Sequence, residues 1–256
     1  MNQNTLILVG SGIKFMSHLT IESKACIEKA DKVLFLVNEP LMQEWILRVN
    51  SNAESLDEIY KKTPQRHENY LLIADYIIEN LKKYQTLCVV MYGHPTMLVQ
   101  PSIYAANIAI ENGYKVIVMP GISAEDCLYA DLLINPISCG CQSYEATDFL
   151  IHKRKYDSGS HLIIWQPSVI GILGLPGDKI NKNGLELLVN YLKNKYELTY
   201  KITLYEAAQY PDFKPRIEKI YLKDLPEAKL TRLTTLYIPP NKINKPSRKV
   251  ISSLRR

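Results

Sequence analysis

The sequence has no long hydrophobic run, and this absence sets a first limit on its class. Its 256 residues contain no apolar stretch near the ~20 residues that a membrane-spanning helix needs. The chain begins with MNQNTLILVG, which lacks a basic segment and reads directly as a strand. We therefore expect neither a membrane anchor nor a signal peptide. Hydrophobic residues make up 46% and charged residues 22%, which is ordinary for a globular protein of one or two domains.

Several motifs of catalysis and metal binding are also missing. The sequence has no GKS or GKT phosphate-binding loop and no GxSxG nucleophile elbow. Its histidines are scattered, and the closely spaced pair Cys139 and Cys141 has no second pair, so we expect no metal site. An odd number of cysteines at irregular spacing indicates reduced thiols and a cytoplasmic protein. The cysteines are residues 26, 88, 127, 139 and 141.

Outside one segment, neither positive nor negative charge is in clear excess. KINKPSRKVISSLRR, at the end of the sequence, holds six Lys or Arg and no acid, which leaves 25 basic and 26 acidic residues elsewhere. A nucleic-acid-binding protein is expected to carry its positive charge on the folded body. We therefore expect a basic tail, residues 241–256, that is solvated or touches a partner, and no nucleic-acid role. Phenylalanine is rare too: 17 tyrosines against 4 phenylalanines favour phenols at a wet cleft or interface.

The first half of the chain alternates between apolar strands and helices. Continuous apolar strands separated by helices predict a parallel sheet that is covered on both faces. The strands are expected at 5–10, 32–37, 86–92 and 115–120. The helices are expected at 19–30, with Thr20 as the cap, and at 40–49, 66–84 and 102–113.

The second half predicts a different sheet. A strand at 161–166 and a helix at 184–196 precede three closely spaced strands, which favour antiparallel pairing. These strands are expected at 200–208, 216–225 and 234–240. The predicted fold is therefore α/β with two lobes. Residues 1–120 form a parallel-sheet lobe and residues 121–240 a mixed-sheet lobe, followed by the basic tail.

Three loops that follow predicted strands contain glycine. In VGSGI, Gly10 and Gly12 begin a dinucleotide-binding pattern, but Phe15 stands where the third glycine belongs. This loop is either a tight strand-to-helix turn or a place where another ligand approaches the backbone. MYGHP contains Gly93, and MPGISAED contains Ser123, whose hydroxyl and nearby free N–H groups lie at an expected helix start. Ligands bind at the carboxyl ends of parallel strands, so these loops predict a ligand cleft.

The segment YKKTPQRHENY, residues 60–70, combines phenols with a cation. Arg66 and Tyr70 are four residues apart and therefore share one face of a helix. A guanidinium beside a phenol favours the phenolate and lowers its pKa from ~10. Tyr60 lies upstream and can fold back onto this pair. The alternative is a surface arginine that stacks on a tyrosine.

With these residues in view, the chain resembles tetrapyrrole-methylase-fold enzymes that use S-adenosylmethionine. More narrowly, it resembles the borosin peptide α-N-methyltransferases, which methylate backbone amides of a ribosomal precursor peptide. The similarity runs in family order over about residues 5–240. The matching segments are LVGSGI, HLTIES, KVLFLVNEP, YKKTPQRHENY, MYGHPTMLVQPS, MPGISAEDCLYADLLINP, GCQSYEATDFL, IIWQ and TTLYIPP.

This resemblance implies a site and its chemistry. S-adenosylmethionine would lie in a cleft between the two lobes and leave as S-adenosylhomocysteine. The implied cofactor contacts are Tyr92, Gly93, His94, Met97, Leu98, Ser123, Ala124, Gln166, Ala207 and Thr235. Tyr70 would be the base and Arg66 would tune it. Tyr60 would donate to the amide oxygen, and Tyr92 would orient the amide and the sulfonium.

The resemblance also implies partners. Fused borosin enzymes continue into a clasp region and a substrate core, whereas this sequence ends soon after TTLYIPP. We therefore expect the split type, which acts iteratively on a separate precursor peptide. The implied assembly is a homodimer that binds two peptides. Asp57 and Glu58 stand where the family has another tyrosine.

Other functions remain open at this point. An enzyme of the same fold could instead methylate a corrinoid or the ribose of ribosomal RNA. A protein of a different class would bind the cofactor as a sensor without catalysis, although it would not need Arg66, Tyr70 and Tyr92. A nucleotide-binding dehydrogenase is disfavoured by Phe15.

Overall fold

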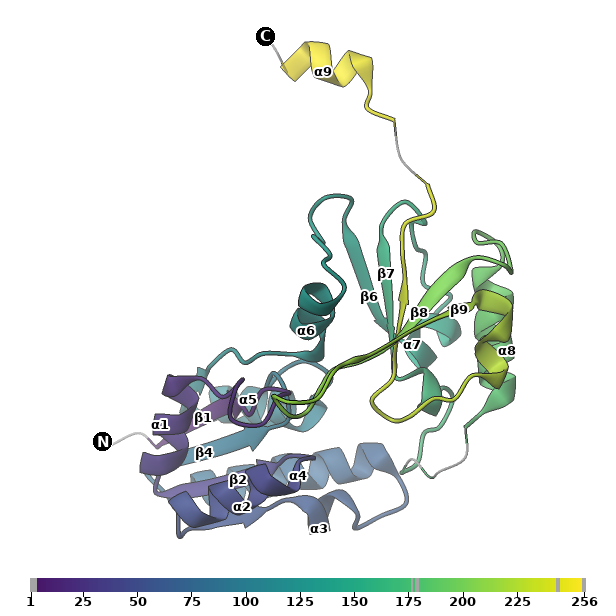
Figure 1. Cartoon of the computed structure of the whole chain (residues 1–256). Helices are drawn as coiled ribbons and strands as arrows, with labels where there is room; N and C mark the ends of the chain where they lie inside the picture. Colours follow the sequence, from purple (N-terminus) through teal and green to yellow (C-terminus); the bar gives the residue numbers. More distant parts are fainter. Residues whose placement is uncertain (1–3, 176, 178–179, 243–244, 255–256) are drawn as a thin grey trace. The chain divides into compact units, whose positions relative to one another are not determined.

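The computed structural model describes residues 4–175, 177, 180–242 and 245–254. These residues form two compact units, each built around its own five-stranded sheet (Figure 1). The first unit comprises the described residues of Met1–Leu132, Ile172–Gly177 and Ala207–Pro215. The second comprises those of Leu133–Gly171, Asp178–Glu206 and Arg216–Arg256. Because one sheet is parallel and the other mixed, the predicted α/β class is confirmed.

The sheet of the first unit is parallel and has the order β3-β2-β4-β1-β5. Its strands are β1 (Thr5–Gly10), β2 (Lys32–Leu36), β3 (Ala53–Ser55), β4 (Thr86–Met91) and β5 (Lys115–Val118). Strands β4 and β5 flank β1, so the loops that follow these three strands leave the same edge of the sheet. This edge carries the glycine-containing loops that the sequence singles out.

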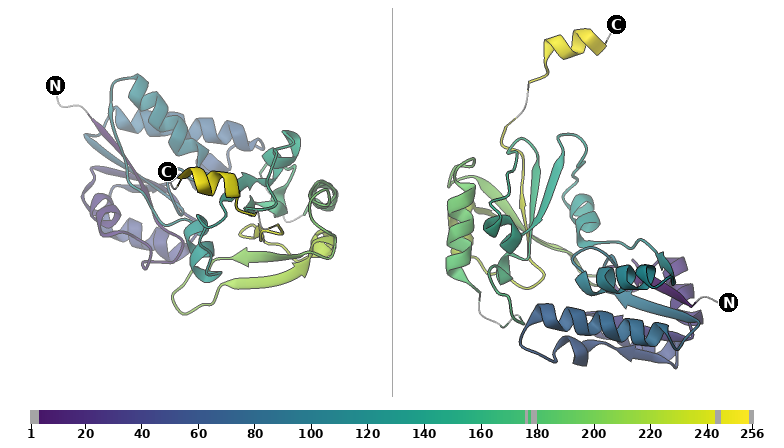
Figure 2. Two further views of the ribbon diagram at one scale, coloured as in Figure 1. Left: turned by 90° about the horizontal axis from the view of Figure 1, so that it is seen from above. Right: turned by 180° about the vertical axis from the view of Figure 1, so that it is seen from behind.

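Helices cover both faces of this sheet. They are α1 (Ile21–Lys29), α2 (Pro40–Val49), α3 (Asp57–Tyr60), α4 (Arg66–Leu81) and α5 (Gln100–Glu111). Helix α6 (Ala124–Asp131) follows β5 along the chain. Leu6 and Leu8 of β1 belong to the apolar cluster of α4 and α5, whereas Val9 belongs to that of α1 and α2. Successive strand residues point to opposite faces, which explains why the strands are apolar throughout. Figures 1 and 2 show the two helical layers.

Local signals fix where the first two helices begin. The Thr20 hydroxyl accepts a hydrogen bond from Ser23 N at 3.1 Å, which confirms Thr20 as the cap of α1. Pro40 opens α2, where its missing N–H costs nothing. The Glu39 carboxylate caps this helix by accepting from Leu41 N at 3.1 Å and Met42 N at 2.7 Å.

The sheet of the second unit has the order β6-β7-β10-β8-β9. Strands β6 and β7 are parallel, and the remaining neighbours are antiparallel. The strands are β6 (Cys141–Glu145), β7 (His161–Trp165), β8 (Lys201–Glu206), β9 (Arg216–Tyr221) and β10 (Thr235–Ile238). The helices are α7 (Ala146–Ile151), α8 (Lys182–Leu192) and α9 (Arg248–Leu254), with the 3-10 helices η1 (Pro167–Val169) and η2 (Leu222–Glu227).

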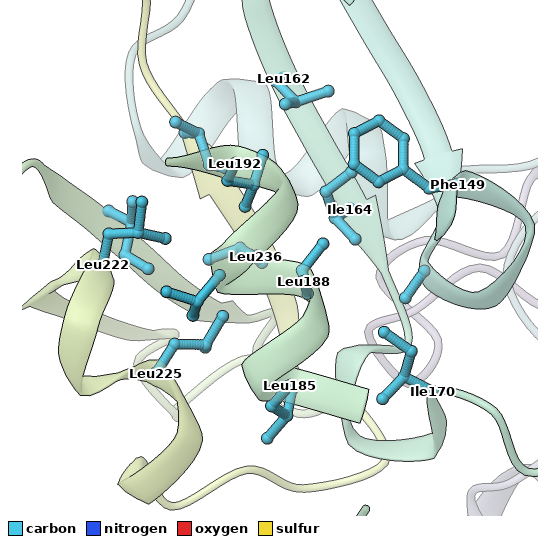
Figure 3. Packing of buried hydrophobic residues seen from close by; sticks show 14 of the residues in the cluster. Phe149, Leu162, Ile164, Ile170, Leu185, Leu188, Leu192, Leu222, Leu225 and Leu236 are labelled. Atoms are coloured by element: carbon cyan, nitrogen blue, oxygen red, sulfur yellow. The ribbon is translucent and has the colours of Figure 1, made fainter. Parts of the chain in front are cut away.

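Helix α8 packs its apolar face onto this mixed sheet (Figure 3). Leu185, Leu188 and Leu192 of the helix are fully buried with Ile164 of β7 and Leu236 of β10. Burying one side chain of this size stabilises the folded state by roughly 1.5–3 kcal/mol. The five residues therefore form part of the central core of the second unit.

Many tyrosines serve this core rather than a wet cleft. Tyr156 stacks on Tyr196 with ring centroids 6.1 Å apart. The Tyr156 hydroxyl donates to the carbonyl of Leu192 at 3.3 Å, at the end of α8. Tyr200 likewise donates to the carbonyl of Pro239 at 3.2 Å. A phenol fills apolar space and satisfies a carbonyl that a helix or strand end leaves unpaired, which phenylalanine cannot do.

The sequence analysis did not anticipate several short elements. Strand β3 and helix α3 lie in the polar stretch 50–65, and β6 and α7 precede the strand expected at 161–166. Three to six residues carry too little periodicity to reveal an element, and tertiary pairing decides it instead. Longer elements agree closely, since α2 occupies the expected range.

Candidate active site

Glycines let the loops at the carboxyl edge of the first sheet pack against one another. Gly12 N donates to Gly93 O at 3.2 Å, and Gly93 N donates to Gly12 O at 3.1 Å. A Cβ on Gly10 would lie 2.1 Å from Gly93 O, and one on Gly121 would lie 2.8 Å from the same atom. The glycines of VGSGI therefore have a physical explanation, because the contact between this loop and the loop at Gly93 leaves no room for a side chain.

Tyr92 follows β4 and is held by a distant segment. Its phenol oxygen accepts a hydrogen bond from Gln209 Nε2 at 3.4 Å. Burial raises the pKa of Tyr92, against a smaller lowering effect of the hydrogen bond from Gln209. Tyr92 therefore remains a neutral phenol at physiological pH and retains a hydroxyl proton that it can donate.

The segment Ala207–Pro215 fixes Gln209 by two further contacts. Phe15 N donates to Gln209 O at 2.8 Å. The Tyr210 hydroxyl donates to the Glu39 carboxylate, which is buried and also caps α2. Sequence reasoning did not find Gln209, because its partner is 117 positions away and no local motif marks it.

The loop that follows Tyr92 holds its histidine ring by a backbone hydrogen bond and has a strained backbone. Thr96 N donates to His94 Nδ1 at 3.2 Å, so the neutral imidazole carries its proton on Nε2. Leu98 has a left-handed backbone with φ of 56°, and its side chain is 48% exposed. Such conformations cost about 1–3 kcal/mol and concentrate at ligand sites. Met97 lies half-buried between them.

Ser123 caps α6, and Ala124 is the first residue of this helix. The Ser123 side chain accepts from Glu125 N at 3.2 Å and Asp126 N at 3.3 Å. The Asp126 carboxylate accepts from Ser123 N at 2.7 Å and from its hydroxyl at 2.6 Å. The hydroxyl and the N–H groups that the sequence analysis expected to be free are thus engaged in a capping box.

The two predicted phenols stack on each other near the start of α4, the helix that Arg66 opens. The rings of Tyr60 and Tyr70 stack with centroids 6.2 Å apart and planes inclined by 22°. Tyr60 ends α3, so its predicted return onto Tyr70 is seen in the structure. Arg66 begins α4 and its guanidinium donates to the Ile172 carbonyl at 3.4 Å. All three side chains are half-buried.

The predicted contacts from the second half of the chain fall in both units. Ala207 belongs to the first unit, in the segment that carries Gln209. Gln166 follows β7 with a left-handed φ of 56°, and Thr235 begins the neighbouring strand β10. Because β7 and β10 are antiparallel, Gln166 and Thr235 lie at the same edge of the second sheet.

Other classes of site are not seen in the described chain. Among these residues, no three His, Cys, Asp or Glu side chains gather in a way that would hold a metal ion. No helix in the described ranges has the length and apolar composition needed to cross a bilayer. All five cysteines are free thiols in this part of the chain. The Cys127 thiol lies 3.9 Å from His18 Nδ1, but burial raises its pKa to about 11, so it is not an activated nucleophile.

The fold and the loops at its sheet edge define a methylase-type α/β protein. Residues 5–220 match the family described as Tetrapyrrole (Corrin/Porphyrin) Methylases, and the chain belongs to this family. A crystal structure of uroporphyrin-III C-methyl transferase from Thermus thermophilus complexed with S-adenyl homocysteine has the same fold. It aligns with a TM-score of 0.63 at 15% identity, covering 92% of this chain and 97% of that one.

Curated relatives are more specific. The chain is 35% identical over 254 residues to the "Methyltransferase/ribosomally synthesized cyclic peptide gymnopeptides precursor gymMA1" of Gymnopus fusipes, covering 98% of this chain and 60% of that protein. It is 34% identical over 241 residues to the "Methyltransferase/ribosomally synthesized type I borosin cyclic peptide precursor cmaMA" of Coprinopsis marcescibilis, covering 92% and 62%. The predicted resemblance to borosin proteins is confirmed. The chain spans about 60% of the length of these relatives.

Proposed function

We propose that this chain is an S-adenosylmethionine-dependent methyltransferase that methylates backbone amide nitrogens of a peptide. One structural observation carries the proposal: two phenols, Tyr60 and Tyr70, stack at the start of the helix that Arg66 opens. Family membership supports methyl transfer, and the relatives' names combine a methyltransferase with a cyclic peptide precursor.

The reaction explains why phenols and a cation belong together. A peptide nitrogen shares its lone pair with the carbonyl, which gives the bond a rotation barrier of ~18–20 kcal/mol and makes the nitrogen a poor nucleophile. Methylation requires removal of the N–H proton and stabilisation of the charge that develops on the amide oxygen. A site for this reaction needs a base and at least one hydrogen-bond donor.

The side chains divide into these roles. Tyr70 is the base, and Arg66, one helical turn before it, favours its phenolate form. Tyr60 stacks on Tyr70 and donates to the amide oxygen as negative charge develops there. Tyr92 orients the amide as a donor, a role supported by the burial that keeps its phenol protonated.

We infer that residues at the sheet edges bind a nucleoside that carries a charged sulfur. Leu98 and Gln166, both expected to contact the cofactor, are two of the few described residues other than glycine with a left-handed backbone. When bound, S-adenosylmethionine supplies an activated methyl group. The residues that would hold it are Tyr92, Gly93, His94, Met97, Leu98, Ser123, Ala124, Gln166, Ala207 and Thr235.

The partners of the reaction are part of the proposal. A precursor peptide supplied as a separate chain would be methylated at successive amides, and two copies of this chain would bind two peptides. Native mass spectrometry of the protein with and without a peptide checks the assembly. Monomers alone under both conditions would contradict the dimer.

The activity itself is tested by adding S-adenosylmethionine and a candidate precursor peptide to the protein. Fragment mass spectra should show increments of one methyl group on backbone amides. Tyr70→Phe should abolish turnover and leave the affinity for S-adenosylhomocysteine nearly unchanged. Wild-type turnover in Tyr70→Phe would exclude Tyr70 as the base.

A tetrapyrrole or corrinoid substrate is the second candidate, because the family match itself is to tetrapyrrole methylases. The same assay with uroporphyrinogen in place of the peptide separates the two. Methyl transfer to the macrocycle with none to peptides would replace the proposed function.

A further inference from the structure

A short segment from later in the chain is tied to the start of α4. We call Ile172–Leu175 the strap. Its Gly174 forms an isolated antiparallel bridge with Gln65, and Leu175 N donates to Pro64 O at 3.1 Å. Arg66 Nη2 donates to the carbonyl of Ile172 at 3.4 Å. The strap therefore contacts three consecutive residues, 64–66, that lead into the helix.

These contacts hold the turn that leads into the helix. Gln65 is the N-cap of α4, yet its side chain makes no capping hydrogen bond to described residues. The turn before the helix is held from one side by Asn69, whose side chain bonds Thr63 N at 2.9 Å and Thr63 O at 2.8 Å. The strap holds the same turn through Pro64 and Gln65. A long arginine side chain with several rotamers gains one defined direction from a carbonyl acceptor.

Gly174 lets the strap approach this closely. A Cβ at position 174 would lie 3.1 Å from Pro64 O, which is tighter than ordinary contact. The backbone of Gly174 is not in the left-handed region, so the requirement for glycine is steric. A Cβ added at Gly177, three residues further along the chain, would have no described atom within 4 Å.

We propose that the strap is a positioning element for the reaction, with Gly174 allowing the Ile172 carbonyl to orient Arg66, which lies one helical turn before Tyr70. This inference rests on the proposed function, because it assigns the strap to the same site. The strap touches Arg66 rather than the reacting atoms, and its residues are positioning residues.

Gly174→Val tests the proposal, with Gly177→Val as the matched control. In Gly174→Val, kcat should fall about tenfold to hundredfold, because small misplacements of catalytic groups have effects of this size. KM for the peptide and Kd for S-adenosylhomocysteine should stay within about twofold of wild type. Gly177→Val should match wild type in all three. If the valine variant unfolds, Gly174→Ala places a single methyl group against the same carbonyl.

A second readout does not depend on turnover. The side-chain N–H resonance of Arg66, assigned by its loss in Arg66→Lys, should move in Gly174→Val and stay in place in Gly177→Val. Unchanged kcat or an unmoved Arg66 resonance in Gly174→Val would overturn the inference, as would an equal loss of kcat in Gly177→Val. A wild-type protein that methylates no peptide would instead refute the proposed function, and the Arg66 resonance would still decide the role of the strap.

Discussion

The side chain of Gln209 donates a hydrogen bond to the phenol oxygen of Tyr92, joining residues 117 positions apart in the sequence. Burial raises the pKa of Tyr92, with the effect of Gln209 smaller and opposite. The phenol therefore stays protonated above pH ~10, where an unfolded tyrosine ionises.

The first prediction concerns this ionisation. In an ultraviolet titration, the difference between wild type and Tyr92→Phe should show one phenol that ionises only above pH ~10. Because the folded state retains this proton longer than the unfolded state, the stabilisation from Tyr92 is complete below pH ~10 and declines as pH rises beyond it. An ionisation in the difference spectrum near neutral pH would contradict the assigned donor role.

The second prediction concerns the glycine contact between the loops. Gly10→Ala would place a methyl group 2.1 Å from Gly93 O, so we expect the free energy of unfolding to fall by about 2–4 kcal/mol. Gly177→Ala meets open space and should change it by less than about 0.5 kcal/mol. Thermal unfolding of the two variants checks this. Equal melting temperatures would show that the loops move apart at little cost.

The third prediction concerns Glu54, which is paired at the edge of the first sheet. Lys32 Nζ lies 2.6 Å from Glu54 Oε2, and the Tyr76 hydroxyl donates to Oε1 at 2.6 Å. Burial raises the pKa of Glu54, but the hydrogen bonds from Lys32 and Tyr76 and the positive charge of Lys32 together outweigh burial and lower the pKa below its usual value. The carboxylate is therefore favoured in the folded state.

A lowered carboxyl pKa stabilises the fold above the unfolded value of ~4.3, and this stabilisation is lost as pH falls through the folded value. Tyr76→Phe should reduce the free energy of unfolding by about 0.5–1 kcal/mol near neutral pH, a modest value because Glu54 is partly exposed. The loss should shrink below pH ~4. Chemical denaturation at several pH values measures it, and a pH-independent loss would contradict the assignment.

The fourth prediction separates two roles of Ser123. Because its hydroxyl is already engaged in the capping box, Ser123→Ala should cost about 1 kcal/mol of stability. The affinity for S-adenosylhomocysteine should change little, since any contact would be through the backbone. Ser123→Asn retains a capping oxygen and should recover most of the stability. A large loss of affinity at unchanged melting temperature would instead assign the hydroxyl to the ligand.

Much of the fold could be predicted from local signals. Helix α2 begins at Pro40 and ends at Val49 as expected, because proline, a capping carboxylate and helical spacing agree there. The phenol pair was also predictable, since Arg66 and Tyr70 share a helix and Tyr60 lies just upstream. The remaining site residues are predicted from the family motifs, and both the set of residues and their roles stay predictions.

The supports of the site could not be predicted in the same way. Ile172 contributes a backbone carbonyl to Arg66, and a carbonyl leaves no trace in residue identity. Gln209 lies in an irregular segment, and only the folded chain brings it to Tyr92. Some of the many tyrosines pack in the core of the second unit, whereas Tyr60 and Tyr70 stack near the start of α4. Composition alone cannot distinguish these two uses of tyrosine.

The order in which the chain is made gives these supports a further meaning. A nascent protein synthesised only as far as Leu132 already contains all five strands of the parallel sheet. It still lacks Ile172 and Gln209, which are translated only after the second sheet has begun to emerge. The scaffold can therefore form early, while Arg66 and Tyr92 acquire their partners late. A chain cut between the two sheets would contain the parallel sheet without the acceptor of Arg66 or the donor to Tyr92.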